Sequence, residues 1–178
     1  MSSNGVNLAD MERVGIRSRI LVDLGALADN WRSLARRAAH ARCAGVVKAD
    51  GYGLGAVPVT QALAREGCRD FFVATASEGL ALRERFPDLR IFVFDGPWPG
   101  EEPLFVSAAL TPVLNSPGQV ARWRVHGAGR PWWLHVDTGM SRLGVAAEDA
   151  AGCAGPGLEG LITHFACADE PGSVHNER

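Results

Sequence analysis

The chain has 178 residues, of which 47% are apolar and 21% are charged, and its formal net charge is −2. This composition is typical of a globular protein with one core, or of part of a larger domain, and the weak charge argues against nucleic acid or an anionic membrane as a partner. The apolar runs are shorter than the roughly 18 residues of a membrane-spanning helix, and the N-terminal segment lacks the apolar centre of a signal peptide. We therefore expect a cytoplasmic protein that does not enter a membrane.

The cysteines indicate neither a disulfide framework nor a metal site. No two of them form a CxxC pair, and no group of histidines and cysteines has zinc-binding spacing. The four residues are Cys43, Cys68, Cys153 and Cys167. We expect reduced, mostly packed thiols and no bound metal.

From residue 19 onward, short apolar runs alternate with helix-like segments, whereas residues 1–17 are predicted to be a flexible lead-in. The strand-like runs cover 19–24, 44–49, 70–75, 90–95, 109–114, 132–138 and 158–165. The predicted helices include 27–38, 57–66, 77–86 and one that follows residue 116. Ser77 is the predicted N-cap of the third of these helices. Ser116, Pro117 and Gln119 are typical of an N-cap, an N1 proline and a capping-box partner for the fourth.

The spacing of the strands predicts a parallel sheet. Their ends lie about 20 to 27 residues apart, near Lys48, Ala74, Phe94, Leu114, Asp137 and His164. Six β/α units of this length imply helices packed outside the sheet, in either a doubly wound fold or a (β/α)8 barrel. Both folds place their chemistry at the C-terminal ends of the strands. Lys48, Asp137, Arg142 and His164 are the unusual polar residues at those ends.

The segment VVKADGYGLGA (46–56) has three possible interpretations from its residues alone. In the first, Gly51, Gly53 and Ala56 form a dinucleotide-binding turn, with Glu78 as the acidic ribose ligand. This interpretation leaves the charge of Lys48 unexplained. In the second, Lys48 is a partly buried nucleophile that forms a Schiff base with an aldehyde cofactor such as pyridoxal phosphate.

In this second interpretation the glycines let the backbone pass close to the cofactor, and Tyr52 offers a hydroxyl group. The third interpretation is a lysine whose ammonium group reaches solvent at a strand end, beside a flexible loop. The residues alone leave all three open.

Three motifs together resemble the alanine racemases, which are pyridoxal-phosphate enzymes. VVKADGYGLGA resembles the segment that carries their cofactor lysine, HVDTGMSRLG (135–144) resembles their DTGM-x-R-x-G loop, and LEGLITHFACADEP (158–171) resembles their THF-x-x-ADE segment. The resemblance covers about residues 18–178.

This resemblance implies a PLP-binding (β/α)8 barrel of the TIM type, present as about six of its eight units over 18–178, with the C-terminal β domain absent. It also implies a homodimer that interconverts L- and D-alanine and supplies D-alanine for peptidoglycan.

The resemblance also implies roles for four residues. Lys48 would hold pyridoxal phosphate through a covalent Schiff base and act as one catalytic base. Tyr52 would bind the cofactor phosphate, Arg142 would bind the phenolic oxygen of the pyridine ring, and His164 would lie beside the ring. The structural alternatives are a surface ion pair for Arg142 and a packed core histidine for His164.

The chain also departs from the family pattern. Tyr52 is its only tyrosine, whereas family members have a second, opposing tyrosine base that a partner subunit supplies. His135 stands where many relatives have a lysine, often carbamylated, that supports the arginine. We therefore expect little racemase activity from this chain alone. The remaining alternatives are a non-catalytic PLP-binding barrel, a racemase of serine, lysine or several amino acids, and a dinucleotide-dependent oxidoreductase.

Overall fold

A single parallel sheet organises the computed structural model, which describes residues 20–177. The predicted lead-in over 1–17 lies outside these described residues. The strands are β1 (Gly45–Val46), β2 (Asp70–Val73), β3 (Arg90–Val93), β4 (Thr111–Leu114), β5 (Trp132–Asp137), β6 (Val145–Ala146) and β7 (Leu158–Ile162). Six of them lie within predicted runs, and the short β6 was not predicted.

From β1 to β6, strands that are neighbours in the sequence are also neighbours in the sheet. β1 to β5 pair in sequential order, and β5 then pairs with β7 along Trp132–His135 and with the short β6 at Val136–Asp137. All of these pairings are parallel. This order is typical of a (β/α) barrel, because a doubly wound sheet reverses its strand order at a switch point. Within the described residues β1 and β7 each pair with a single strand, so the sheet is an open arc.

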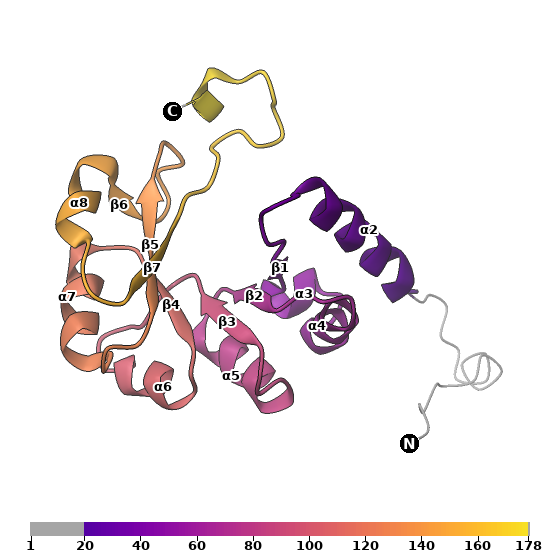
Figure 1. Cartoon of the computed structure of the whole chain (residues 1–178), viewed down its shortest axis with the longest axis horizontal. Helices are drawn as coiled ribbons and strands as arrows, with labels where there is room; N and C mark the ends of the chain where they lie inside the picture. Colours follow the sequence, from indigo (N-terminus) through magenta and orange to yellow (C-terminus); the bar gives the residue numbers. More distant parts are fainter. Residues whose placement is uncertain (1–19, 178) are drawn as a thin grey trace.

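Apart from α2, which precedes β1, the α-helices lie between successive strands in the chain, and α4 to α7 follow one another around the outer side of the arc (Figure 1). The α-helices are α2 (Leu24–Arg37), α3 (Lys48–Tyr52), α4 (Ala56–Arg65), α5 (Ala76–Arg85), α6 (Glu102–Ser107), α7 (Pro117–His126) and α8 (Ala150–Cys153). Two short 3-10 helices are η1 (Ala147–Asp149) and η2 (Val174–Glu177). This alternation confirms the predicted α/β class and the partial barrel.

The strand predicted over 19–24 is wrong for its described residues. Residues 20–23 form no strand, and α2 begins at Leu24. Ile20 and Leu21 are 90% and 88% exposed, so an apolar run here has neither a neighbouring strand nor a core. The side chain of Asp23 instead accepts a hydrogen bond from the amide of Ala26 at 3.0 Å and caps α2.

The caps of α5 and α7 differ in detail from the predicted ones. Thr75, not Ser77, caps α5, because its hydroxyl accepts from the amide of Glu78. Ser116 caps α7 as predicted. The side-chain oxygen of Gln119 accepts from the amide of Asn115 at 2.7 Å, so the reciprocal bond lies one residue before the N-cap.

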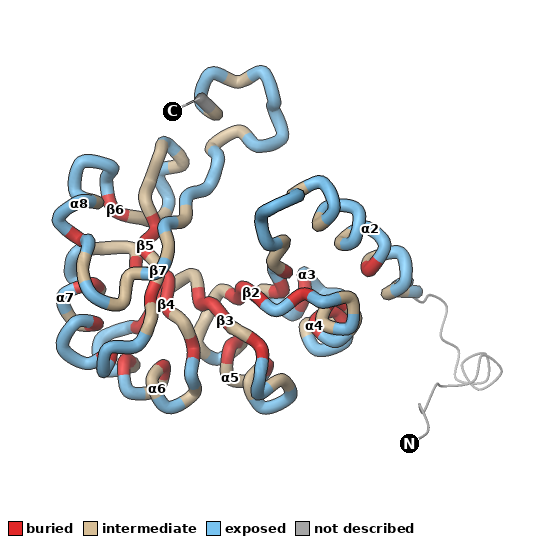
Figure 2. Tube along the Cα trace, viewed as in Figure 1, coloured by how far each residue is buried: buried red, intermediate tan, exposed pale blue. Residues whose placement is uncertain are grey.

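The central strands β2, β3 and β4 are buried on both faces of the sheet. The outer face packs against the helices in the larger core, which includes Phe71 and Val73. The inner face carries a second cluster of Phe72, Phe92 and Val113, and the rings of Phe72 and Phe92 stack at 4.5 Å. Figure 2 shows the buried residues along these strands. Because side chains alternate between the two faces, burial on both sides explains the continuous apolar runs in the sequence.

Two absences hold for residues 20–177. None of the helices there is long and apolar enough to cross a lipid bilayer. In the same stretch no group of three or more His, Cys, Asp or Glu residues lies close enough together to hold a metal ion.

Candidate active site

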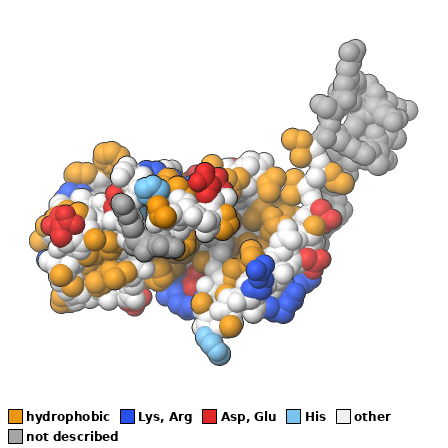
Figure 3. Space-filling view, turned by 90° about the horizontal axis from the view of Figure 1, so that it is seen from above, with side chains coloured by type: hydrophobic (Ala, Val, Ile, Leu, Met, Phe, Trp, Pro, Cys, Tyr) orange, Lys and Arg blue, Asp and Glu red, His pale blue; other side chains and the backbone are white. Residues whose placement is uncertain are grey.

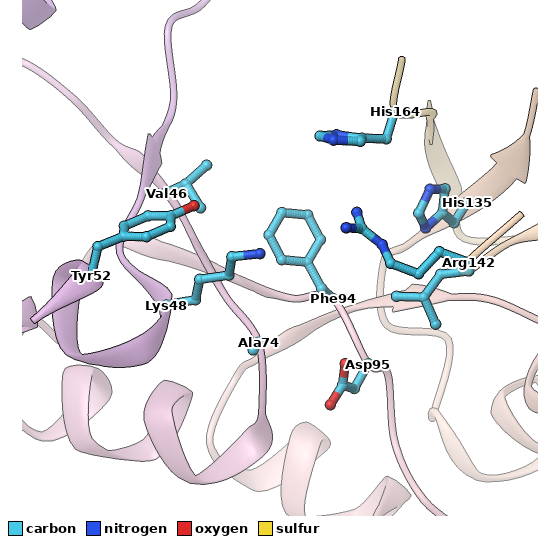
Figure 4. A pocket seen from close by; sticks show the side chains of 10 residues that line it. Val46, Lys48, Tyr52, Ala74, Phe94, Asp95, His135, Arg142 and His164 are labelled. Carbon is cyan, nitrogen blue, oxygen red and sulfur yellow. The ribbon is translucent and has the colours of Figure 1, made fainter. Parts of the chain in front are cut away.

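A pocket of about 320 Å³ lies at the C-terminal ends of the strands. It is lined by Val46, Lys48, Tyr52, Ala74, Phe94, Asp95, His135, Arg142, Leu143 and His164. The four predicted site residues all belong to this set, although they are separated by more than a hundred positions in the chain. Figure 4 shows Lys48 and Tyr52 on one side of the pocket and Arg142 and His164 on the other.

Lys48 projects its amine into the pocket from just beyond β1. The preceding residue, Val47, is buried in the core and fixes the backbone here. The amine Nζ lies 5.9 Å from the ring centre of Tyr52 and 5.8 Å from that of Phe94. These rings form apolar walls that favour a nearby cation. Lys48 is also the only lysine among the 178 residues, a compositional signal that points to this position.

The segment after Lys48 is a left-handed turn rather than the end of a strand. Positive φ angles occur at Ala49 (52°), Asp50 (51°), Gly51 (63°), Tyr52 (56°) and Gly53 (81°). The left-handed conformation costs about 1–2 kcal/mol for each residue with a Cβ atom, and three of these five have one. Such strain is typical of functional sites where the surrounding structure enforces it.

Hydrogen bonds inside the loop leave little of it free to bind a phosphate. The amide of Ala56 donates to the carboxylate of Asp50 at 2.7 Å, and the amide of Gly55 donates to the Asp50 carbonyl at 2.8 Å. The amide of Gly53 donates to the carbonyl of Ala49 at 3.0 Å. Glu78, the acidic residue of the dinucleotide interpretation, is itself bound to backbone amides. The geometry therefore disfavours a dinucleotide turn.

Arg142 and His164 reach the pocket from two loops that follow β5 and β7. Within the first loop, the carboxylate of Asp137 accepts from the amides of Gly139 and Ser141 at 2.9 and 3.0 Å. These hydrogen bonds lower the pKa of Asp137 and shape the loop that carries Arg142. The two loops are joined where the hydroxyls of Thr138 and Thr163 lie 2.7 Å apart.

His135 lies beside Arg142 and is only 6% exposed. Its Nδ1 atom is 3.0 Å from the side-chain oxygen of Asn115. The side-chain nitrogen of Asn115 donates to the carbonyls of Phe94 and Val113, at 2.7 and 3.0 Å. Because those carbonyls can only accept, the amide orientation is determined and Nδ1 of His135 must carry the proton.

The second ring nitrogen of His135 is therefore an acceptor when the ring is neutral. Burial lowers the pKa of His135, and the neighbouring cation of Arg142 lowers it further. His135 and Arg142 lie side by side in Figure 4. A neutral imidazole thus takes the position at which the family resemblance implies a lysine, and Asn115 is a supporting residue that the sequence motifs did not indicate.

Asp95 also lines the pocket, although the sequence did not predict it as a site residue. Burial raises the pKa of its carboxyl group, and the nearby Glu78 adds to this rise, while Lys48 opposes it. Its place directly after β3 is the signal that could have identified it, since pocket residues gather at strand ends.

The residues of this pocket fit pyridoxal phosphate. Lys48 offers an amine for the aldehyde, and Arg142 can donate to an anionic ring oxygen. Val46 and Phe94 give apolar surface for an aromatic ring. The volume of about 320 Å³ lies within the usual range for a site that binds a small molecule.

The comparisons with known proteins agree with this geometry. The family model of the alanine racemase N-terminal domain matches residues 22–178. The chain is 46% identical over 177 residues to an alanine racemase of Rhizobium meliloti, covering 93% of this chain and 46% of that protein. It is 47% identical over 173 residues to a catabolic alanine racemase of Mesorhizobium japonicum, covering 89% of this chain and 45% of that protein.

A solved structure gives the same result for the fold. The alanine racemase from Bartonella henselae, which has covalently bound pyridoxal phosphate, matches with a TM-score of 0.79 at 30% identity. The match covers 88% of this chain and 49% of that one, so the chain spans about half the length of its relatives. By the match of its residues 22–178, the chain belongs to the alanine racemase family, within the N-terminal domain.

Proposed function

We propose that this chain forms the cofactor-binding part of an alanine racemase that interconverts L- and D-alanine. The observation that carries the proposal is the position of Lys48, the only lysine, whose amine faces Arg142 and His164 across the pocket. The names of the relatives supply alanine as the substrate.

The pocket residues would divide the binding of the cofactor among them. Lys48 would hold pyridoxal phosphate covalently, and Tyr52 would bind its phosphate. Arg142 would donate to the phenolic oxygen, and His164 would lie beside the ring. When bound, pyridoxal phosphate delocalises the charge that remains after the α-proton leaves the amino acid.

Racemisation needs a base on each face of the substrate. Lys48 Nζ is suited to take and return the α-proton on one face of the pocket, which Phe94 and Val46 also line. Tyr52 lies on the same side of the pocket as Lys48 (Figure 4), so it does not provide the opposite base. We propose that the second base comes from outside this chain, which spans 46% of the Rhizobium meliloti relative.

The biological role of the product is a further part of the proposal. D-alanine supply for peptidoglycan is one role, and alanine catabolism is the other, because one of the two curated relatives described above is named as catabolic. A cytoplasmic homodimer, with a partner subunit supplying the second base, remains a prediction.

The absence of other lysines gives a direct test of Lys48. The chain is incubated with pyridoxal phosphate, reduced with borohydride and digested for mass spectrometry. We expect the cofactor on the peptide that contains Lys48, and no labelled peptide of this kind from Lys48→Ala. Absence of label on Lys48 in the folded chain would contradict the proposal.

Turnover separates the racemase from a non-catalytic cofactor-binding protein. General-base catalysis is worth about 10²- to 10⁴-fold in rate, so we expect the isolated chain to racemise alanine more slowly than a whole relative by at least this factor. Co-expression with the remaining part of the Rhizobium meliloti relative should raise the rate if the two parts assemble. An assembled complex that binds the cofactor at Lys48 but does not turn over would favour the non-catalytic alternative.

A further inference from the structure

Glu78 connects the turn after Lys48 to the next β/α unit. It is the third residue of α5, and its side chain is half-buried. One carboxylate oxygen accepts from the amide of Ala49 at 2.8 Å. The other accepts from the amide of Ala74 at 2.8 Å and from that of Thr75 at 3.4 Å. A single side chain thus binds the backbone just after β1 and just after β2.

The position of these contacts is informative, because Ala49 directly follows the reactive lysine. Ala49 is also the first residue of the left-handed turn, with φ of 52°. A residue with a Cβ atom leaves this conformation unless something holds it there. The carboxylate of Glu78 contacts the amide of this very residue from 29 positions along the chain.

The chemistry of the contact requires a carboxylate. All three partners of Glu78 are backbone N–H donors. An ionised carboxylate has only acceptors, so each oxygen can bind its own amide group. A glutamine of the same shape has one acceptor and one donor, and its NH₂ group would face an N–H group. Hydrogen bonds to a charged partner are also stronger than neutral ones.

We propose that Glu78 is a positioning residue for Lys48. Its carboxylate holds the strained turn so that the amine of Lys48 faces the pocket and remains available to an aldehyde. This inference rests on the proposed function, since it concerns the reaction of Lys48 with pyridoxal phosphate. Glu78 contacts neither the amine nor the pocket directly, and it acts through the backbone of Ala49.

The test compares Glu78→Gln with Glu84→Gln in the full chain. Both variants neutralise one glutamate of α5, but Glu84 is exposed. Each protein is labelled at its only lysine with pyridoxal phosphate and borohydride, and separately with a small acetylating reagent that reports exposure of the amine. We expect labelling by pyridoxal phosphate to slow by about tenfold or more in Glu78→Gln, as loss of a charge-assisted hydrogen bond implies. Acetylation should change little, and Glu84→Gln should match the unaltered chain in both reactions.

The outcomes separate this inference from the proposed function. No label on Lys48 in the unaltered chain contradicts the proposed function itself. Equal labelling of Glu78→Gln and the unaltered chain contradicts only the role of Glu78. Equal slowing of both reactions in Glu78→Gln also contradicts it, because that result indicates general damage.

A second measurement does not depend on whether Glu78→Gln folds. In the unaltered chain, amide hydrogen exchange at Ala49 should be as slow as at Gly51, whose amide donates to the carbonyl of Val47 at 2.9 Å. Fast exchange at Ala49 together with slow exchange at Gly51 would overturn the inference.

Discussion

His135 shows how a buried ring can be kept neutral by its neighbours. Asn115 fixes the proton on Nδ1, and its own amide is fixed by two carbonyls at the ends of β3 and β4. A second proton would place a cation in a buried position beside Arg142. Burial and this cation both lower the pKa of His135.

The stability of the chain should therefore depend on pH through His135. The pKa of His135 in the folded chain lies below its ordinary value of 6.5, so the unfolded chain binds a proton first as the pH falls. Stability is then fully present above pH 6.5 and decreases below it, until the folded form is protonated too. Urea unfolding at several pH values measures this decrease.

A matched pair of variants isolates the contribution of His135. His135→Asn keeps a donor toward Asn115 but does not titrate, so its stability should change less between neutral and mildly acidic pH. His126→Asn alters an exposed histidine of α7 and should behave as the unaltered chain. Identical pH profiles for all three proteins would rule out the proposed protonation state.

The cysteines divide into two accessible and two inaccessible thiols. Cys68 and Cys153 are buried, and Cys43 and Cys167 are half-buried. Burial raises the pKa of Cys68 to about 11, and only the thiolate reacts readily. We expect a thiol reagent to modify Cys43 and Cys167 in the native chain and all four residues in urea. Mass spectrometry measures the rate of labelling at each cysteine. If Cys68 were labelled as fast as Cys43, this part of the core would be open to solvent.

At the scale of single residues, the sequence predicts the residues that line the pocket better than the residues that hold them in place. Lys48, Arg142 and His164 stand at or beyond strand ends, so a parallel sheet brings them together. Asn115 and Glu78 act through backbone amides and carbonyls, and such contacts have no sequence pattern.

Among the elements, the turn at 49–53 is the one that most affects the site. Its glycines suggested clearance for a cofactor or flexibility, yet Ala49, Asp50 and Tyr52 in this turn also adopt positive φ angles. Hydrogen bonds of Asp50 within the loop and the contact of Glu78 with Ala49 accompany this conformation, whereas local propensity opposes it. A left-handed turn in residues of this kind is therefore not predictable from the sequence.

The strain in this turn predicts an unusual effect of glycine. Ala49→Gly removes about 1–2 kcal/mol of left-handed strain, against about 0.5–1 kcal/mol of added entropy in the unfolded chain. We expect a gain in the free energy of unfolding of up to about 1.5 kcal/mol. Ala81→Gly, at an exposed right-handed position in α5, should lose about 1 kcal/mol. Urea unfolding measures both values, and a loss of the same size in both variants would argue against a left-handed turn.

At the scale of the whole molecule, the sheet is an open arc within the described residues, and this arc leaves apolar side chains at the surface. Leu161 of β7 is 63% exposed, and Val46 of β1 is 42% exposed. Figure 3 shows hydrophobic side chains gathered along the hollowed middle of one face. Strands that pair on one side only are sites where further strands or other chains can add.

We therefore expect the isolated chain to self-associate as its concentration rises. Leu161→Lys places a charge on the edge strand β7 and should reduce association. Val125→Lys makes the same kind of change on α7, where Val125 is 73% exposed, and should have little effect. Sedimentation velocity over a range of concentrations compares the three proteins. Equal association of all three would exclude the β7 edge as the contact.

Much of the fold could be predicted from the sequence, because a single β/α unit repeats along the chain and gives a regular alternation of strand and helix segments. The central strands β2 to β4 are buried on both faces and give continuous apolar runs, as 70–75 and 90–95 illustrate. The run 19–24 has the same apolar pattern, but its residues 20–23 form no strand and α2 begins at Leu24. A strand forms only where a neighbouring strand can pair with it, and the local sequence does not show that neighbour. The sequence likewise does not show the order of the strands in the sheet, which is what distinguishes a barrel from a doubly wound sheet.

The sequential strand order has a consequence for how the chain can be made. Each of β2 to β5 pairs with a strand that precedes it by a single β/α unit. During synthesis, a new strand therefore finds its partner already present and only a short loop must close. Contacts of low sequence separation favour rapid folding. The arc can thus grow one unit at a time from the N-terminal side, with each completed unit serving as the template for the next.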